Sequence, residues 1–169
     1  MKTMRKILCV LLVLVAVLSL SACGQKAETP ADDPAAKKCT IAVSCATILT
    51  ADTAIAKEKA EYIPEDGWIF TQTEVAFTEG DTAADVLQRI CREKKIPMDF
   101  EESVAYGVYV KGINNIYEGD CGQLSYWTYT VNGEFLDVGC GLYKVQEGDE
   151  ICMLYTCNMG ADVGLDMAM

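Results

Sequence analysis

The sequence contains no histidine. Histidine is the commonest general base near neutral pH and the commonest nitrogen ligand of protein-bound metals. Its absence excludes Ser-His-Asp and Cys-His mechanisms and every metal site that needs an imidazole. The serine-nucleophile motifs GxSxG and SxxK are also missing. A hydrolase is therefore the least supported function for this chain, and we expect no cofactor.

Basic residues are scarce, with 14 Lys and Arg against 25 Asp and Glu and a net charge of -11. Nucleic-acid binding needs a positive face, so we expect no nucleic-acid partner. The acidic residues show neither EF-hand spacing nor an evident carboxylate pair for glycoside hydrolysis. The chain has 169 residues, 51% of them hydrophobic, which suits one globular domain.

One long apolar run is present, at the N-terminus. Lys2, Arg5 and Lys6 precede residues 7–20, an apolar run of about 14 residues, which is shorter than the roughly 20 that span a bilayer. This pattern is typical of a secretory signal peptide. The following Ser21-Ala22-Cys23 resembles the lipobox of bacterial lipoproteins, which implies a signal peptide over 1–22 and a lipid on Cys23. The alternative is an ordinary signal peptide cut near Ala22, with Cys23 unmodified.

The lipobox implies a location outside the cytoplasm, on the bacterial cell membrane. Residues 23–38 are rich in alanine and charge and include Pro30 and Pro34, which predicts a semi-stiff tether. The composition becomes β-branched and aromatic after that point, so we place the domain at 39–157. Residues 158–169 form a tail without clear periodicity.

The sequence of the domain predicts several strands and one amphipathic helix. Strand-like segments lie at 40–49, 68–77, 104–111, 125–131 and 150–156, and 53–62 suits either a short helix or a loop. Asn132-Gly133 predicts a tight hairpin turn. Thr82 and Asp85 have capping-box spacing, and Val86, Leu87, Ile90 and Cys91 follow at helical spacing. The fold class is therefore α+β, a mainly antiparallel sheet packed against one main helix.

Three segments carry a family resemblance: 44–49, 75–96 and 113–151. The element Gly80-x-Thr82-x-x-Asp85-Val86-Leu87 and the element Trp127-x-Tyr129-x-Val131-Asn132-Gly133 occur in this order. Together they resemble the transcobalamin-like C-terminal domain family, also called domain of unknown function 4430. The resemblance implies a β-grasp-like fold and a non-catalytic binding module. It also suggests a corrinoid-like ligand, for which the helical half of the site would come from another domain or protein.

Seven cysteines fall within the predicted domain, and their spacing contains no CxxC. With no histidine either, we expect no metal site. Disulfides are expected outside the cytoplasm, although Cys45 and Cys91 suit buried thiols. We favour a bond between Cys121 and Cys140, because both lie in glycine-containing loops around the strand at 125–131.

The candidate recognition surface extends from 117 to 135, and Asn114 and Asn115 would supply hydrogen bonds to it. Its aromatic and amide side chains could contact a ligand, although core packing is the alternative for Trp127 and Tyr129. The candidate ligand-binding residues are Asn114, Asn115, Tyr117, Tyr126, Asn132 and Phe135.

Two functions remain open at this point. The first is a membrane-anchored module that captures a small ligand for a transporter. The second is a cell-surface domain that binds a protein, glycan or cell-wall polymer through its sheet or loops.

Overall fold

The computed structural model describes residues 36–51, 55, 57–104 and 107–165. The predicted signal peptide, Cys23 and most of the predicted tether lie outside these residues. The strands are β1 (Lys37–Ser44), β2 (Trp68–Phe77), β3 (Met98–Ser103), β4 (Gly107–Ile113), β5 (Ile116–Tyr117), β6 (Tyr126–Val131), β7 (Glu134–Phe135) and β8 (Glu150–Thr156). The helical elements are α2 (Ala83–Lys94) and the 3-10 turns η3 (Ala46–Leu49), η4 (Lys57–Tyr62) and η5 (Ala161–Val163).

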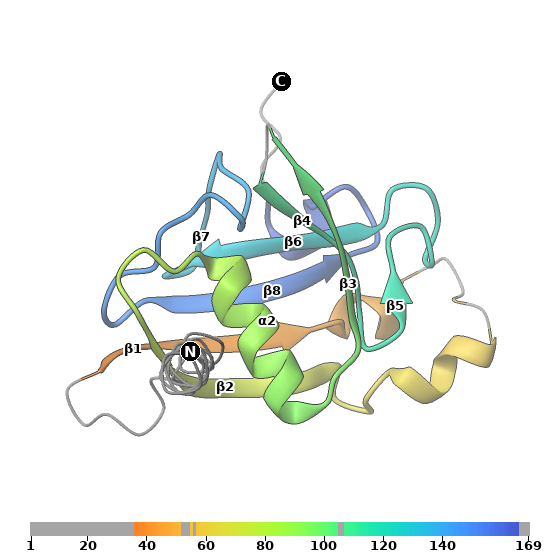
Figure 1. Ribbon diagram of the computed structural model, residues 1–169. Coiled ribbons are helices and arrows are strands. Elements are labelled where there is room, and N and C mark those ends of the chain that lie inside the picture. The colour runs from red at the N-terminus through yellow and green to blue at the C-terminus, as the bar shows by residue number, and fades with distance from the viewer. Residues whose placement is uncertain (1–35, 52–54, 56, 105–106, 166–169) are drawn as a thin grey trace, which may run out of the picture.

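The strands form a five-stranded sheet in the order β2-β1-β8-β6-β7 and a three-stranded sheet in the order β3-β4-β5 (Figure 1). Every pairing is antiparallel except that of β1 with β8. The first and last long strands are thus central neighbours, and α2 connects β2 to the second sheet. This confirms the predicted α+β class, with mainly antiparallel sheets and one main helix.

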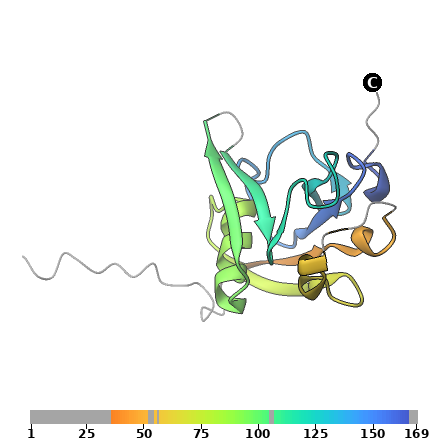
Figure 2. The ribbon, with the colours of Figure 1, turned by 90° about the vertical axis from the view of Figure 1, so that its right-hand side faces the viewer.

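Helix α2 begins with the predicted capping box. The Thr82 hydroxyl accepts a hydrogen bond from Asp85 N, and the Asp85 side chain accepts one from Thr82 N. These bonds satisfy backbone donors that the first helical turn leaves free. The buried face carries the predicted Val86, Leu87, Ile90 and Cys91, preceded by two alanines. Figure 2 shows α2 and the β3–β4 hairpin on one side of the five-stranded sheet.

The core forms where α2 meets the alternating side chains of the sheet. Ile41 and Val43 on β1, and Trp127 and Tyr129 on β6, point into it. The predicted face of β6 is therefore core, and Trp127 also donates from Nε1 to Ile116 O at 2.9 Å. This hydrogen bond gives the buried indole N–H an acceptor. None of the described helices is long and apolar enough to cross a membrane.

Three local features differ from the sequence expectation or refine it. The segment 40–49 splits into β1 and the turn η3, and the segment after 55 forms η4. Strand β3 was not predicted, because five of its six residues are polar, exposed or both. The Asn132-Gly133 turn is as predicted, since both residues have positive φ, at 54° and 82°.

Candidate functional site

A surface hollow lies between β4 and β6, and we call it the β4–β6 groove. It has a volume of about 440 Å³ and is lined by residues 108–110, 126–129 and 136–140 together with Met153. Residues 126–129 of β6 pair only with β8, because β7 reaches no further than Thr130 and Val131. Strand β5 pairs with β4 only at Gly112 and Ile113, so residues 108–110 of β4 have no partner strand on that side. Two strand edges without a neighbouring strand therefore flank the groove.

A close backbone contact fixes one end of the groove. The loop after β7 crosses β4 at Gly141, where an added Cβ would lie 2.0 Å from Val108 N. Only glycine permits this approach without moving one of the two backbones. Cys140, next to it, accepts a hydrogen bond at its carbonyl oxygen from Ala84 N at 3.0 Å. The N-terminus of α2 thus holds the loop that carries Leu136 and Val138.

The groove offers neutral aromatic groups and one carboxylate. Tyr109 donates from its hydroxyl to Glu118 Oε2 at 2.6 Å, and burial together with this carboxylate raises the pKa of Tyr109. Tyr129 donates to Val138 O at 2.7 Å, and burial raises the pKa of Tyr129. Asp137 is the one charged side chain among the lining residues. The groove therefore suits an uncharged or cationic, largely apolar ligand.

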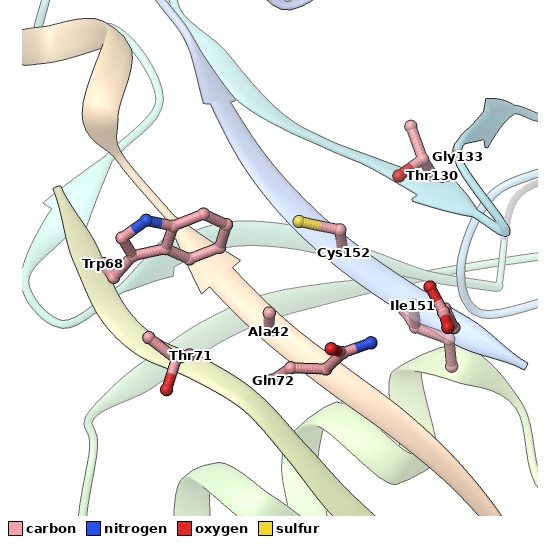
Figure 3. A pocket seen from close by; sticks show the side chains of 9 residues that line it. Ala42, Trp68, Thr71, Gln72, Thr130, Gly133, Ile151 and Cys152 are labelled. Atoms are coloured by element: carbon pink, nitrogen blue, oxygen red, sulfur yellow. The ribbon is translucent and has the colours of Figure 1, made fainter.

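The second hollow lies on the sheet face away from α2, and we call it the open-face hollow. It has a volume of about 410 Å³ and is lined by Ala42, Trp68, Thr71, Gln72, Thr130, Gly133 and residues 150–152. Figure 3 shows the Trp68 indole and the Cys152 thiol on the strands either side of Ala42. Gln72 donates to Thr40 Oγ1 at 3.2 Å, which fixes its amide along β1. This hollow carries one exposed aromatic ring, that of Trp68, and several polar groups.

Three predicted site residues gather around Lys59. Asn114 and Asn115 form the turn between β4 and β5 with φ of 53° and 61°, and the Asn114 amide donates to Tyr62 O at 2.8 Å. Lys59 donates to Asn115 O at 2.8 Å and lies 4.7 Å from the centre of the Tyr117 ring. Their amide and aromatic groups thus contact the protein itself. Whether they also bind a ligand stays a prediction.

The other three predicted residues lie along β6 and β7. Tyr126, half-buried, lines the β4–β6 groove. Asn132 lies at the far end of β6, about 20 Å away by strand rise, and its side chain bonds Asp149 Oδ1 at 3.1 Å and Glu150 N at 2.9 Å. Phe135 lies in β7 and pairs with Thr130 of β6. The structure therefore brings Tyr126 alone of the six into the groove.

The favoured disulfide between Cys121 and Cys140 is not supported by the structure. Cys140 directs its thiol to Val108 O at 3.6 Å, beside the groove. Cys121 instead lies in the loop before β6, where its backbone N–H donates to Ser125 Oγ at 3.1 Å. Position in two glycine-containing loops does not reveal that the loops pack against different parts of β6. Burial raises the pKa of the Cys39, Cys45, Cys91 and Cys140 thiols to about 11.

Sequence reasoning missed most of the groove. Tyr109, Leu136 and Val138 line it, and Tyr109 and Val138 are among the exposed large hydrophobic residues. Alternation along β4 would place Tyr109 opposite Val108 and Val110, but no local pattern reveals that β4 lies beside β6. Among the described residues, no group of three or more His, Cys, Asp or Glu could hold a metal ion.

Comparisons with known proteins cover part of the chain. No curated protein matches it. A crystal structure of a candidate metal binding protein from Ruminococcus gnavus ATCC 29149 is 16% identical, with a TM-score of 0.42 over 71% of this chain and 96% of that one. The structure of haptocorrin in complex with Cbi is 18% identical, with a TM-score of 0.48 over 70% of this chain. This chain spans 25% of the haptocorrin chain.

The family comparison matches the segment that builds the groove. The model of the family described as "Domain of unknown function (DUF4430)" covers residues 80–156. This range extends from the turn before α2 to the end of β8, and it includes both motifs that carried the resemblance. Residues 80–156 of the chain therefore match the model of the DUF4430 family.

Proposed function

We propose that this chain is a non-catalytic binding module outside the cytoplasm, anchored to the cell membrane through a lipid on Cys23, which captures a small ligand for a transporter. The observation that carries the binding role is the β4–β6 groove, with Tyr109, Tyr126 and Leu136 beside two strand edges. Its volume of about 440 Å³ is within the usual range for small-molecule sites. The lipobox and signal-peptide pattern of residues 1–23 support the anchor.

The chemistry of the described side chains supports binding rather than catalysis. The chain has no histidine. The Tyr129 hydroxyl and the Cys140 thiol beside the groove have raised pKa values because they are buried. Both groups are therefore protonated at neutral pH and are poor nucleophiles.

The lining also restricts the ligand. No Lys or Arg side chain lines the groove, and Asp137 would repel an anion. A planar or apolar ligand could instead contact Tyr126 and Leu136 and donate a hydrogen bond to Asp137. A corrinoid is the ligand that the family resemblance suggests, and part of so large a molecule would project beyond the groove.

A ligand screen with two matched variants tests this function. The purified protein is heated with corrinoids and with uncharged or cationic aromatic compounds. A ligand at a hundred times its Kd should stabilise the protein by about 2.7 kcal/mol. Tyr126→Ala should reduce the shift strongly, whereas Trp68→Ala, on the opposite sheet face, should leave it unchanged. If Trp68→Ala alone abolished the shift, the groove would not be the site.

The open-face hollow favours a second function, in which the sheet binds a glycan or a protein on the cell surface. Trp68 is 37% exposed and lies beside Thr71 and Gln72. Aromatic rings with neighbouring polar groups are common at such contact surfaces. Retention of the protein on cell-wall polysaccharide, lost in Trp68→Ala and kept in Tyr126→Ala, would support this function instead.

A further inference from the structure

The segment after β8 folds back onto the loop that precedes β6. Met159 N donates to Leu124 O at 2.9 Å, which joins the two segments through the backbone. Asp162 holds the turn itself, because it bonds the Thr156 hydroxyl and accepts from Cys157 N at 2.8 Å. The described part of the tail is therefore built into the domain, at the end of the sheet where β6 begins.

Two cysteine side chains meet at this junction. The side chain of Cys121 lies close enough to Cys157 to raise the pKa of Cys157. Cys121 N and the hydroxyl of Tyr155, two residues before Cys157, both bond Ser125 Oγ, at 3.1 Å and 3.0 Å. Cys121 is fully buried, whereas Cys157 is partly exposed. The Sγ atom of Cys157 lies 3.8 Å from Thr47 Oγ1. The thiols of Cys39 and Cys140 instead donate to the backbone carbonyls of Val75 and Val108.

We propose that Cys121 and Cys157 form a disulfide bond that fastens the segment after β8 to the loop before β6. The backbone bond between Met159 and Leu124 holds the two segments together within three residues of each cysteine, which is where a disulfide would join them. The inference rests on the extracytoplasmic location in the proposed function, because thiols persist in the cytoplasm and disulfides persist outside it.

The oxidant is a disulfide, either oxidised glutathione or a thiol oxidoreductase of the same compartment. The partly exposed Cys157 gives up its proton and attacks the oxidant, which forms a mixed disulfide and releases one thiol. Cys121 then loses its proton and attacks the Cys157 sulfur, which releases the second thiol. Two protein thiols are oxidised, one external disulfide is reduced, and both protons end on the released thiols.

Burial and the Cys121 contact raise the pKa of Cys157 to about 12. A thiolate is therefore rare while the tail is docked, and we expect the bond to form as the tail docks during folding rather than afterwards.

The bond would also order one wall of the groove. Cys121 lies four residues before Ser125, and Ser125 directly precedes Tyr126 on β6. Asp162, in the same tail, is near enough to Tyr126 to raise its pKa further beyond the effect of burial. Both ends of the proposed bond thus lie next to the first residue of β6.

Peptide mapping decides whether the bond forms. The full chain is refolded with reduced and oxidised glutathione, alkylated and digested. Trypsin alone is insufficient, because no Lys or Arg separates Cys121 from Cys140 or Cys152 from Cys157. Chymotrypsin cleaves both intervals, at the aromatic residues 126–129 and at Tyr155. The expected product joins the Cys121 and Cys157 peptides and is 2 hydrogens lighter than their sum.

Thermal unfolding gives a second measurement. Reduction with dithiothreitol should lower the Tm of the oxidised protein by about 10 °C, the shift typical of losing a disulfide in a domain of this size. Cys157→Ser should make the Tm insensitive to dithiothreitol. Cys152→Ser, which alters another partly exposed cysteine, should keep the full sensitivity.

Three results would overturn the proposal: a Cys121–Cys140 peptide, alkylation of both Cys121 and Cys157 after oxidative refolding, or a dithiothreitol effect that persists in Cys157→Ser. None of these measurements includes a ligand, so failure here is separate from failure of the binding function. A cross-link without ligand binding would reject only the function, and ligand binding without a cross-link would reject only the disulfide.

Discussion

Two tyrosine side chains in or beside the core, Tyr155 and Tyr143, have hydroxyl groups that are bonded to other parts of the domain. Tyr155 is 1% exposed, stacks edge-to-face on Trp127 with ring centres 5.1 Å apart, and donates its hydroxyl to Tyr117 O at 2.7 Å. Burial is the largest cause that raises its pKa to about 12. Tyr143 also has a pKa raised to about 12, through burial and a hydrogen bond to Asp149.

These shifts predict a loss of stability at alkaline pH. An unfolded tyrosine has a pKa near 10, so the folded state binds the phenolic proton more tightly than the unfolded state does. The stability from Tyr155 and Tyr143 is complete below pH 10 and is lost as the pH rises from 10 to 12. Urea unfolding between pH 8 and 11.5 should show a falling midpoint above pH 10. A reduced fall in Tyr155→Phe would assign part of it to that residue, and a flat profile in the native protein would contradict the prediction.

Asparagine shows what the sequence can and cannot predict at this scale. Asn132 was predicted correctly as a turn residue, because Asn-Gly is suited to two positive φ values. The same asparagine was also a candidate ligand contact, yet its side chain bonds Asp149 and Glu150 N. Turn preference is a local property, whereas the partner of a side-chain amide depends on which strand lies beside it.

Helix α2 is the element whose packing is easiest to test. Leu87 is 0% exposed and lies between the helix and the sheet. Leu87→Ala should reduce the free energy of unfolding by about 2–5 kcal/mol, because it leaves a cavity in a close-packed core. Glu93→Ala changes an exposed residue on the same helix and should alter stability by less than about 0.5 kcal/mol. Urea unfolding measures both, and similar effects of the two substitutions would mean that Leu87 does not face the core.

Elements with a clear period were predictable, and elements defined by their neighbours were not. The α2 range, β2 and β8 match the sequence pattern closely, since alternation and helical spacing mark a buried face. Strand β3 has no such face, because it pairs with β4 as a hairpin and remains largely exposed. Short β5 and β7 exist only because the turns before them bring two residues back onto a longer strand.

The arrangement of the whole molecule depends on contacts between distant parts of the chain. The parallel pairing of β1 with β8 joins residues about 110 apart, and the β4–β6 groove forms between strands that belong to different sheets. No local pattern specifies either arrangement. The sequence therefore predicted the fold class and the helix. It also named Tyr126 as a candidate site residue, but it did not predict the β4–β6 groove that Tyr126 lines.

Attachment to a membrane is the property of the whole molecule that residues 1–23 predict. Each buried methylene of an acyl chain contributes about 0.8 kcal/mol, so a multiply acylated Cys23 would hold the domain firmly on a bilayer. The excess of acidic residues gives no electrostatic attraction to anionic lipid headgroups. Cys23→Ser should therefore move the protein from the membrane fraction to the soluble fraction or leave its signal peptide uncleaved. Cys9→Ser, within the apolar run, should leave attachment unchanged. Mass spectrometry of the mature native protein decides the chemistry, because an N-terminal fragment with an unmodified Cys23 thiol would contradict the anchor.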